Sequence, residues 1–479
     1  METLQRTANR GSISTATYEI DNSLKLERAN SENIYRQIID GNRKTWTSSL
    51  WIKRVDTATP SYNLFFNHGI YGVGTYLRFN NNDTLTAAIE TYGGGTSQVT
   101  NAVFRDTSAW MHIVWRVDTT QSTEADRSRI YINGEQITSF SSATYPSQNA
   151  DTLANHDHGG YDDVELGYKD AGIYSNMYYA DVYHVDGQSL APTEFGELDS
   201  DTGIWKPIEA DISSFGNNGF YLDFSDASSL GTDSAGNGSF TLSNVTSADQ
   251  ATDTPTNNFC TFNPIASYIQ RPITSSGITN GATKVTQTSI GAWCGGIATM
   301  GVKSGKWYYE AKIYDTDDLM LGFSTFSGDT STTTAPHAIG TNIIYYGGGS
   351  SGSYWFYYVD GTATSNSSNR GTAWSVGDLI GIALDLDNSK ANFYVNGSLA
   401  GSSNTNVDIS DVTDEINSTG DFLIPFAGMW RSTIEFNFGG YTITTLSSAA
   451  SDANGYGNFE YAPPSGYYAL CTQNLALYG

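Results

Sequence analysis

Charged residues, proline and cysteine are all scarce in this 479-residue sequence. Charged residues make up 15% of the chain, and 50 Asp and Glu against 24 Lys and Arg give a formal net charge of −26. Such an acidic surface repels phosphate backbones and anionic lipid headgroups, so neither nucleic acid nor a membrane surface is expected as a partner. Carboxylates suit hard cations instead, and calcium is the ion to consider.

The three cysteines, Cys260, Cys294 and Cys471, are odd in number, widely spaced and form no CxxC pair. We therefore expect no structural zinc site, and free, buried, reduced thiols in a chain that folds in a cytosol. The N-terminal METLQRTANRGSIS has no apolar core, which predicts the absence of a signal peptide. The longest apolar run, residues 422–430, is too short to span a bilayer, so we expect no membrane insertion.

Long runs of Ala, Leu, Glu and Lys are also absent, while aromatic residues reach 13% and alternation is frequent. Apolar residues alternate in TWTSSLWIK (45–53) and WMHIVWRVD (110–118), and again in GKWYYEAKIYD (305–315) and DLIGIALDLD (378–387). RIYING and NFYVNG each end in the hairpin signal Asn-Gly, at Asn133 and Asn396. The pattern predicts an all-β chain with two copies of one sandwich or jelly-roll architecture.

Composition divides the chain into four parts. Residues 1–17 are polar and are read as an N-terminal arm, and residues 18–200 as the first sandwich. Residues 201–264 are rich in Asp, Ser, Asn and Thr and form a connector, either a linker or strands packed on a neighbouring domain. Residues 265–479 are predicted to form the second sandwich.

Particular strings in both halves resemble known families. IDNSLKLERANSE (20–32) and YYADVYHVDGQSLAPTEFGELDSDTGIWKP (178–207) resemble laminin-G-like, concanavalin A-like jelly rolls of bacteriophage structural proteins. GVKSGKWYYEAKI (301–313) and WSVGDLIGIALDLDNSKANFYVNGS (374–398) resemble a SPRY domain, with an insertion at 441–457. The resemblance implies two concanavalin A-like sandwiches in tandem and a virion protein, such as a tail fibre or another surface appendage.

The string NHDHGGYDD (155–163) gathers imidazoles and carboxylates within nine residues. One interpretation is a metal-binding loop, holding calcium or another divalent ion; the other is an exposed hairpin tip. DSAGNG (233–238) offers the same choice between a calcium loop and an Asx turn. The candidate metal ligands are His156, Asp157, Asp162 and Asp163.

The string IIYYGGGSSGSYWFYY (343–358) joins two aromatic strands through a Gly-rich tip. Aromatic rings stack on the apolar faces of sugars, so we predict a glycan-contacting hairpin here. Alternation allows only part of the set to face outward: either Tyr354 and Phe356, or Trp355 and Tyr357, point to the core. The candidate glycan-binding residues are Tyr345, Tyr346, Tyr354, Trp355 and, in the first half, Tyr161.

The sequence argues against catalysis. A glucanase on this fold needs paired carboxylates on one strand, but Glu-x-Asp-x-Glu does not occur, and ELDSD (197–201) is expected in a loop. We therefore predict a non-enzymatic virion protein that binds host polysaccharide or lipopolysaccharide for adsorption. It would be made in the host cytoplasm, carried in the virion as a homo-oligomer, and contact other virion proteins. The alternatives are a structural decoration protein of capsid or tail, and a polysaccharide-degrading enzyme.

Overall fold

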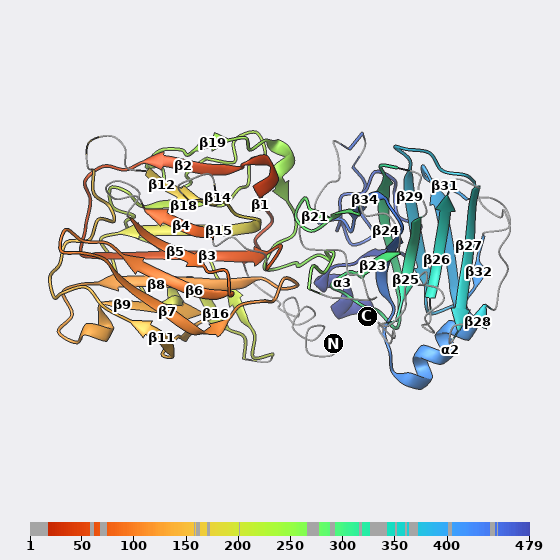
Figure 1. Cartoon of the computed structure of the whole chain (residues 1–479), viewed down its shortest axis with the longest axis horizontal. Helices are drawn as coiled ribbons and strands as arrows, with labels where there is room; N and C mark the ends of the chain where they lie inside the picture. Colours follow the sequence, from red (N-terminus) through yellow and green to blue (C-terminus); the bar gives the residue numbers. More distant parts are fainter. Residues whose placement is uncertain are drawn as a thin grey trace. The chain divides into compact units, whose positions relative to one another are not determined.

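The chain forms two compact units, residues 14–256 and 257–479, in the computed structural model shown in Figure 1. The structure describes residues 18–57, 62–67, 74–157, 159, 163–169, 173–200, 202–265, 277–287, 293–315, 319–325, 343–349, 352–359, 362–363, 372–400, 405–440, 446–447 and 449–479. The predicted arm, 1–17, lies outside these residues. Within them, no helix has the length and apolarity needed to cross a membrane.

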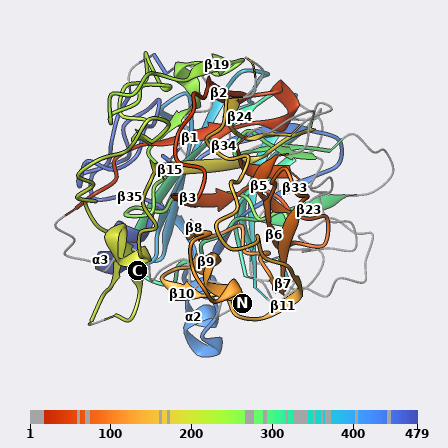
Figure 2. The ribbon, with the colours of Figure 1, turned by 90° about the vertical axis from the view of Figure 1, so that its left-hand side faces the viewer.

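The first unit is a sandwich of two eight-stranded sheets, which appear as two facing layers in Figure 2. The β3 sheet has the order β10-β9-β8-β3-β15-β1-β20, and β18 also pairs with β15. Its strands are β1 (Ser23–Leu26), β3 (Thr45–Arg54), β8 (Met111–Asp118), β9 (Ser128–Ile132), β10 (Glu135–Gln136), β15 (Met177–Asp186), β18 (Phe220–Leu222) and β20 (Gln250–Ala251).

The facing β5 sheet has the order β11-β7-β6-β5-β4-β12-β2-β19. Its strands are β2 (Asn33–Gln37), β4 (Tyr62–Asn67), β5 (Thr75–Phe79), β6 (Thr84–Ile89), β7 (Thr96–Val103), β11 (Phe140–Ala143), β12 (Asp163–Leu166) and β19 (Thr241–Ser243). Two small hairpins complete the unit: β13 (Tyr168–Lys169) with β14 (Ile173–Tyr174), and β16 (Gly196–Leu198) with β17 (Trp205–Pro207).

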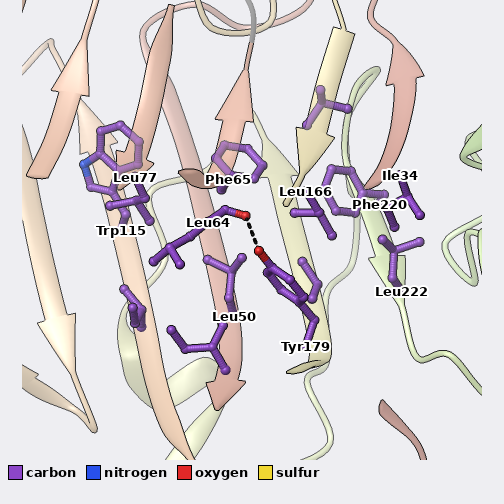
Figure 3. Packing of buried hydrophobic residues seen from close by; sticks show 14 of the residues in the cluster. Ile34, Leu50, Leu64, Phe65, Leu77, Trp115, Leu166, Tyr179, Phe220 and Leu222 are labelled. Atoms are coloured by element: carbon purple, nitrogen blue, oxygen red, sulfur yellow. Dashed lines mark hydrogen bonds between the residues drawn. The ribbon is translucent and has the colours of Figure 1, made fainter. Parts of the chain in front are cut away.

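The core of the first unit lies between the two sheets, as Figure 3 shows. Leu50 and Trp115 project from the β3 sheet and Phe65 and Leu77 from the β5 sheet, and all four are fully buried. Tyr179 also enters from the β3 sheet, and its hydroxyl donates to the carbonyl oxygen of Leu64 at 3.1 Å. The inward set of β3 and β8 is the one that period-2 alternation predicts, so that prediction is confirmed.

The connector belongs to the first sandwich. β18, β19 and β20 pair with β15, β2 and β1, which are strands of its two sheets. The connector also places Asp249 2.8 Å from the ammonium of Lys25, and Asp253 2.7 Å from that of Lys53. Both lysines are 1% exposed, because the connector covers the outer face of the β3 sheet. In the structure the connector therefore contributes strands to both sheets of the first sandwich.

The two ends of the first unit meet. The backbone N–H of Ile20 donates to Oγ1 of Thr256 at 3.1 Å, and the same hydroxyl donates back to the carbonyl oxygen of Ile20 at 2.9 Å. Close by, Ser23 pairs with Ala251 where β1 begins and β20 ends. The chain therefore enters and leaves this sandwich at one place, and the division falls at 256/257 instead of 264/265.

The second unit is also a two-sheet sandwich. The β24 sheet has the order β21-β22-β34-β24-β29-β30-β31, with β32 on β30 and β35 on β24. Its strands are β21 (Ile278–Thr279), β22 (Lys284–Thr286), β24 (Lys306–Ile313), β29 (Leu379–Asp385), β30 (Lys390–Val395), β31 (Ser398–Leu399), β32 (Val407–Asp408), β34 (Thr433–Asn437) and β35 (Tyr468–Ala469). The β25 sheet, β23-β33-β25-β26-β27-β28, consists of β23 (Cys294–Ile297), β25 (Leu319–Ser324), β26 (Ile343–Gly349), β27 (Gly352–Val359), β28 (Thr362–Ala363) and β33 (Ile424–Met429).

Two short helices, α2 (Ser410–Thr419) and α3 (Thr472–Tyr478), accompany these strands. The residues that alternation places on one face of β24 and on one face of β29 are neighbours in the sheet, since Tyr309 of β24 pairs with Ile382 of β29. The opposite face of β24 is buried as well, under the C-terminal segment. There the carboxylate of Glu310 accepts from the backbone N–H groups of Glu460 and Tyr461, which anchors the chain that follows the predicted insertion.

Candidate functional site

Four segments that are distant in sequence meet at one end of the first sandwich. The β2–β3 loop supplies Asp40, the β6–β7 turn supplies Tyr92, and the loop before β12 supplies His156. Nδ1 of His156 lies 2.9 Å from Oδ1 of Asp40, and its Nε2 lies 2.7 Å from the hydroxyl of Tyr92. Asn217 of the connector donates to the carbonyl oxygen of Asp40 at 3.0 Å, so all four segments are tied together.

The chemistry of this chain of contacts fixes the hydrogen positions. A carboxylate only accepts, so Nδ1 of His156 carries the hydrogen that faces Asp40, and in the neutral ring Nε2 accepts from the Tyr92 hydroxyl. The hydrogen bond from His156 lowers the pKa of Asp40 below its ordinary value. The guanidinium of Arg43 lies over the ring of Tyr92, 5.2 Å from its centroid. The ring itself is 62% exposed, so it is held at its hydroxyl while its body faces solvent.

A buried polar layer supports these loops from below. Asp186 at the end of β15 accepts from the backbone N–H of Asn42 at 2.7 Å and from that of Asn218 at 3.1 Å. A Cβ on Gly41 would lie 2.1 Å from Oδ2 of Asp186, so the close approach of this loop requires glycine. Burial raises the pKa of Asp186. The loops are therefore positioned by the sandwich and not by one another alone.

His184 forms the deepest part of this support. It is fully buried, and its ring bonds Oγ of Ser48 at 2.9 Å and Oδ1 of Asn155 at 3.0 Å. The amide oxygen of Asn155 accepts, so Nε2 of His184 donates to it and Nδ1 accepts from Ser48. Burial lowers the pKa of His184 to about 3, which keeps the imidazole neutral and Asn155, the residue before His156, in place.

The metal ligands predicted from NHDHGGYDD are only partly brought together. Both ring nitrogens of His156 already have protein partners, and Asp163 begins β12 with Gln37 as its pairing partner. Among the residues that the structure describes, no group of three or more His, Cys, Asp or Glu side chains fits a metal ion. Tyr161 and Asp162 lie outside the described residues, so the described part of this loop gives the metal interpretation no support.

The loop DSAGNG is an Asx turn tied to an arginine. Oδ1 of Asp233 accepts from the backbone N–H groups of Tyr221 and Ala235, each at 2.9 Å. Its Oδ2 accepts from the backbone N–H of Asn237 and from Arg36, each at 3.0 Å. Protein donors thus occupy both oxygens, as the turn interpretation requires.

The prediction of glycan contact is wrong for Tyr345 and Tyr346. The β26–β27 hairpin exists, but both side chains are 0% exposed. Tyr346 packs edge-on against Trp374 at 4.8 Å and stacks on Phe393 at 5.3 Å, so it belongs to the core. Alternation assumed one solvent-facing side for this strand, whereas Ile344 to Gly347 are buried on both sides.

The other two predicted residues of the hairpin lie in β27, where Tyr354 pairs with Gly347 and Trp355 with Tyr346. Their side chains are outside the described part of the chain. The proposed contact of Tyr354 or Trp355 with a glycan therefore stays a prediction.

The carboxylates of ELDSD form ion pairs on a small hairpin. Glu197 and Asp199 lie 3.1 Å and 3.4 Å from the same ammonium group, that of Lys206 in β17. Both carboxylates are therefore paired with one ammonium group of the same hairpin. Asp201 lies outside the described residues.

Sequence reasoning identified His156 but missed Asp40 and Tyr92. They lie 116 and 64 residues from His156, so no local spacing relates them. The available signals were the turn dipeptide Asp40-Gly41 and a tyrosine directly before three glycines at Gly93 to Gly95.

Fold and site together define a protein of two concanavalin A-like β-sandwiches with a polar, aromatic loop end on the first. Residues 29–167 match the Laminin_G_3 family, described as the concanavalin A-like lectin/glucanases superfamily, and residues 306–441 match the SPRY domain family. The chain thus carries a laminin-G-like domain followed by a SPRY domain. No curated protein matches it.

Solved structures with similar folds include a heptameric SAP-like pentraxin from Limulus polyphemus, 11% identical over 36% of this chain and 80% of that one, with a TM-score of 0.28. The SPRY domain of human HERC1 is 17% identical over 34% and 90%, with a TM-score of 0.21. A candidate carbohydrate-binding protein from Bacteroides ovatus is 17% identical over 47% and 58%, with a TM-score of 0.34. All three TM-scores are below 0.5, so these likenesses carry no argument.

Proposed function

We propose that this chain is a glycan-binding protein whose first sandwich holds a sugar at the Asp40–Tyr92–His156 loop end. The observation that carries the proposal is the exposed ring of Tyr92, fixed at its hydroxyl by His156 and backed by a rigid polar layer. An aromatic ring held in this way stacks on the apolar face of a sugar at little cost in side-chain entropy. The adjacent carboxylate of Asp40 accepts hydrogen bonds from sugar hydroxyls.

Binding without hydrolysis is part of the proposal. Glu197 and Asp199 both form ion pairs with Lys206. The pKa of the exposed carboxylate of Asp40 is lowered, which makes this group a poor general acid. A glycosidase would require a second carboxyl group with a raised pKa close to Asp40, to act as the acid. Incubation of the protein with bound polysaccharide should therefore release no reducing sugar, and release would support the enzyme alternative.

The biological setting we propose is a bacteriophage virion, with the chain as a tail fibre or similar appendage that adsorbs to host polysaccharide or lipopolysaccharide. Support for this setting comes from the strings at 20–32 and 178–207, which resemble phage structural proteins. A shallow polar site binds one sugar weakly, so adsorption would depend on several copies per particle. Immunogold labelling of intact particles tests the setting: label on fibres supports it, and label over a regular capsid lattice supports the decoration alternative.

The binding proposal is tested with the full-length chain on a glycan array that includes capsular polysaccharides and lipopolysaccharides. Tyr92→Ala should lower the affinity by about tenfold, equivalent to about 1.4 kcal/mol. Tyr478→Ala, which removes a partly exposed ring in the second unit, is the matched control and should bind like the parent chain. Absence of any glycan binding, or equal binding by the Tyr92 variant and the parent, would overturn the proposal.

A further inference from the structure

The two sheets of the first sandwich differ in what lies on their outer faces. The connector and the β16–β17 hairpin cover the β3 sheet, where even Lys25 and Lys53 are 1% exposed. On the β5 sheet the outward residues Tyr35, Glu165 and Tyr76 are partly exposed, whereas those of β6, namely Thr84, Thr86 and Ala88, are buried. Among the residues that the structure describes, the accessible part of this face therefore lies around Tyr35, Glu165 and Tyr76.

A single lateral row crosses this accessible face. Strand register pairs Tyr35 of β2 with Glu165 of β12, and Glu165 in turn pairs with Phe66 of β4. Phe66 pairs with Tyr76 of β5, and Tyr76 pairs with Ala88 of β6. Residues paired in this way share one face of a sheet. In each of these strands at least one neighbour of the row belongs to the core: Ile34, Val164, Phe65, Leu77 and Ala87.

The row has the geometry of a platform with two rings. Tyr35 and Tyr76 are three strand spacings apart, which is about 14 Å at about 4.8 Å per strand. Glu165 lies between them and carries a carboxylate that can accept hydrogen bonds from hydroxyl groups. Beyond Tyr76 the row continues with Ala88 and Ser97, whose short side chains cannot overhang the ring.

The partner of Tyr76 on its own strand is Arg78. The guanidinium of Arg78 lies over the Tyr76 ring, 4.7 Å from its centroid, and donates to Oδ1 of Asn80 at 3.3 Å. Asn80 in turn donates to Oγ1 of Thr86 at 2.7 Å. This network restrains one ring of the platform, so it loses little freedom when a ligand stacks on it.

The platform is continuous with the loop end. Tyr35 and Gln37 share one side of β2, and two residues further on Ile39 is 57% exposed, directly before Asp40. On the other side of the platform, β6 carries Ala88 and leads into the turn that presents Tyr92. The row and the loop end are therefore connected through β2 and β6, the strands that lead from one to the other.

We propose that the outer face of the β5 sheet is a binding platform for an extended, uncharged polysaccharide, with Tyr35 and Tyr76 as its two stacking rings. The proposal rests on the glycan-binding function proposed above and adds the ligand's chemical class and length. A spacing of about 14 Å is bridged by several linked sugar rings and not by one. The carboxylates of Glu165 and Asp40 and the guanidinium groups of Arg78 and Arg43 both lie along the path, so its local charge is mixed. The net charge of −26 on the whole chain disfavours sulfated and uronic-acid polymers.

The experiment measures affinity as a function of glycan length in the full chain. Dextran, mannan and a β-glucan are the uncharged probes, heparin and polysialic acid the anionic ones, and fragments of increasing length come from the best uncharged binder. Affinity should rise with length until both rings are spanned. Tyr35→Ala and Tyr76→Ala should each lower the affinity for long fragments by about tenfold and leave that for the shortest fragments unchanged. Tyr478→Ala is the control for both, and circular dichroism checks that the variants fold.

The possible outcomes separate this proposal from the one on which it depends. Loss of long-fragment binding in both variants, with Tyr92→Ala weakening fragments of every length, supports the platform. Binding that depends on Tyr92 but not on Tyr35, Tyr76 or fragment length overturns the platform and leaves the loop site standing. Tighter binding of heparin or polysialic acid than of any uncharged probe overturns the ligand class. No binding of any glycan overturns both proposals.

Discussion

Asn396 and Asp378 clamp the end of the β29–β30 hairpin, where Nδ2 of Asn396 donates to Oδ1 of Asp378 at 2.8 Å. Oδ1 of Asn396 accepts from the backbone N–H of Leu379 at 3.0 Å, and its own N–H donates to the carbonyl oxygen of Leu379 at 2.8 Å. In the first unit Asn133 bonds His112 through the same two groups, at 2.8 and 2.9 Å. The two sandwiches thus fasten the open ends of the strand pairs β8–β9 and β29–β30 in the same way.

The two asparagines adopt left-handed backbone conformations, with φ of 48° at Asn133 and 49° at Asn396. Replacement of either by Ala should lower the free energy of unfolding of its own unit by about 2 kcal/mol, because a left-handed alanine is strained and the side-chain bonds are lost. Replacement by Gly loses only the bonds and should cost about 1 kcal/mol. Urea denaturation measures both, and equal costs for Ala and Gly would contradict the role of the backbone.

The buried pair Lys53–Asp253 should be essential to the first unit. Asp253→Asn removes the negative charge beside a fully buried ammonium. It also leaves one acceptor oxygen where Lys53 and the Trp110 indole N–H, 2.9 Å away, now use two. We expect a loss of about 3–5 kcal/mol in the free energy of unfolding. Asp151→Asn is the control, since Asp151 is 55% exposed and 3.8 Å from Lys44, and it should cost no more than about 1 kcal/mol. Similar losses in the two variants would contradict the tight packing of the connector.

Acid should destabilise the first unit through its buried histidines. Burial lowers the pKa of His112 to about 3, and Trp205 Nε1 donates to its Nδ1 at 2.9 Å, a bond that needs the neutral ring. A base whose folded pKa lies below its unfolded pKa of 6.5 contributes stability above 6.5 and loses it as the pH falls toward about 3. His112→Gln should reduce the slope of unfolding free energy against pH by about 1.4 kcal/mol per unit in that window. An unchanged slope in denaturant titrations would refute the assignment.

Asp181 should act in the opposite direction. It occupies a bulge of β15 with φ of 41°, and the hydroxyls of Tyr18 and Tyr221 donate to it at 2.8 and 2.9 Å. Burial, reinforced by the charge of Asp223, raises its pKa from 3.8 to about 7. The stability it contributes is therefore complete below 3.8 and lost as the pH rises through about 7, a change of roughly 4 kcal/mol. The Asp181→Asn variant should lack this component, which the difference between its pH–stability curve and that of the parent measures.

Period-2 alternation predicted the sandwich cores because it reports which residues share a face. It correctly grouped Trp46 with Leu50, and Ile113 with Trp115. It could not report whether the other face of a strand is also covered, and for that reason Tyr345 was predicted at the surface. The covering segments come from other parts of the chain, as with the connector over the β3 sheet, and local pattern does not contain them.

The loop site was only partly predictable for a related reason. The composition of NHDHGGYDD pointed to His156, but its partners Asp40 and Tyr92 come from other loops. Turn dipeptides mark where a loop lies without stating which loops meet. His156 turns both ring nitrogens toward residues far away in the chain, and a local motif does not contain those contacts.

The meeting of Ile20 and Thr256 determines how the first sandwich responds to tension along the chain. Because β1 begins where β20 ends, a pulling force enters and leaves at the same edge and acts across the short β1–β20 ladder. In this geometry the force is perpendicular to the strands, so the hydrogen bonds break one after another. In a shear geometry the force is parallel to the strands and all the hydrogen bonds bear it together. When its ends are pulled, the unit therefore yields first at this seam, and the rest of the β3 sheet and the β5 sheet bear no force until β1 and β20 have parted.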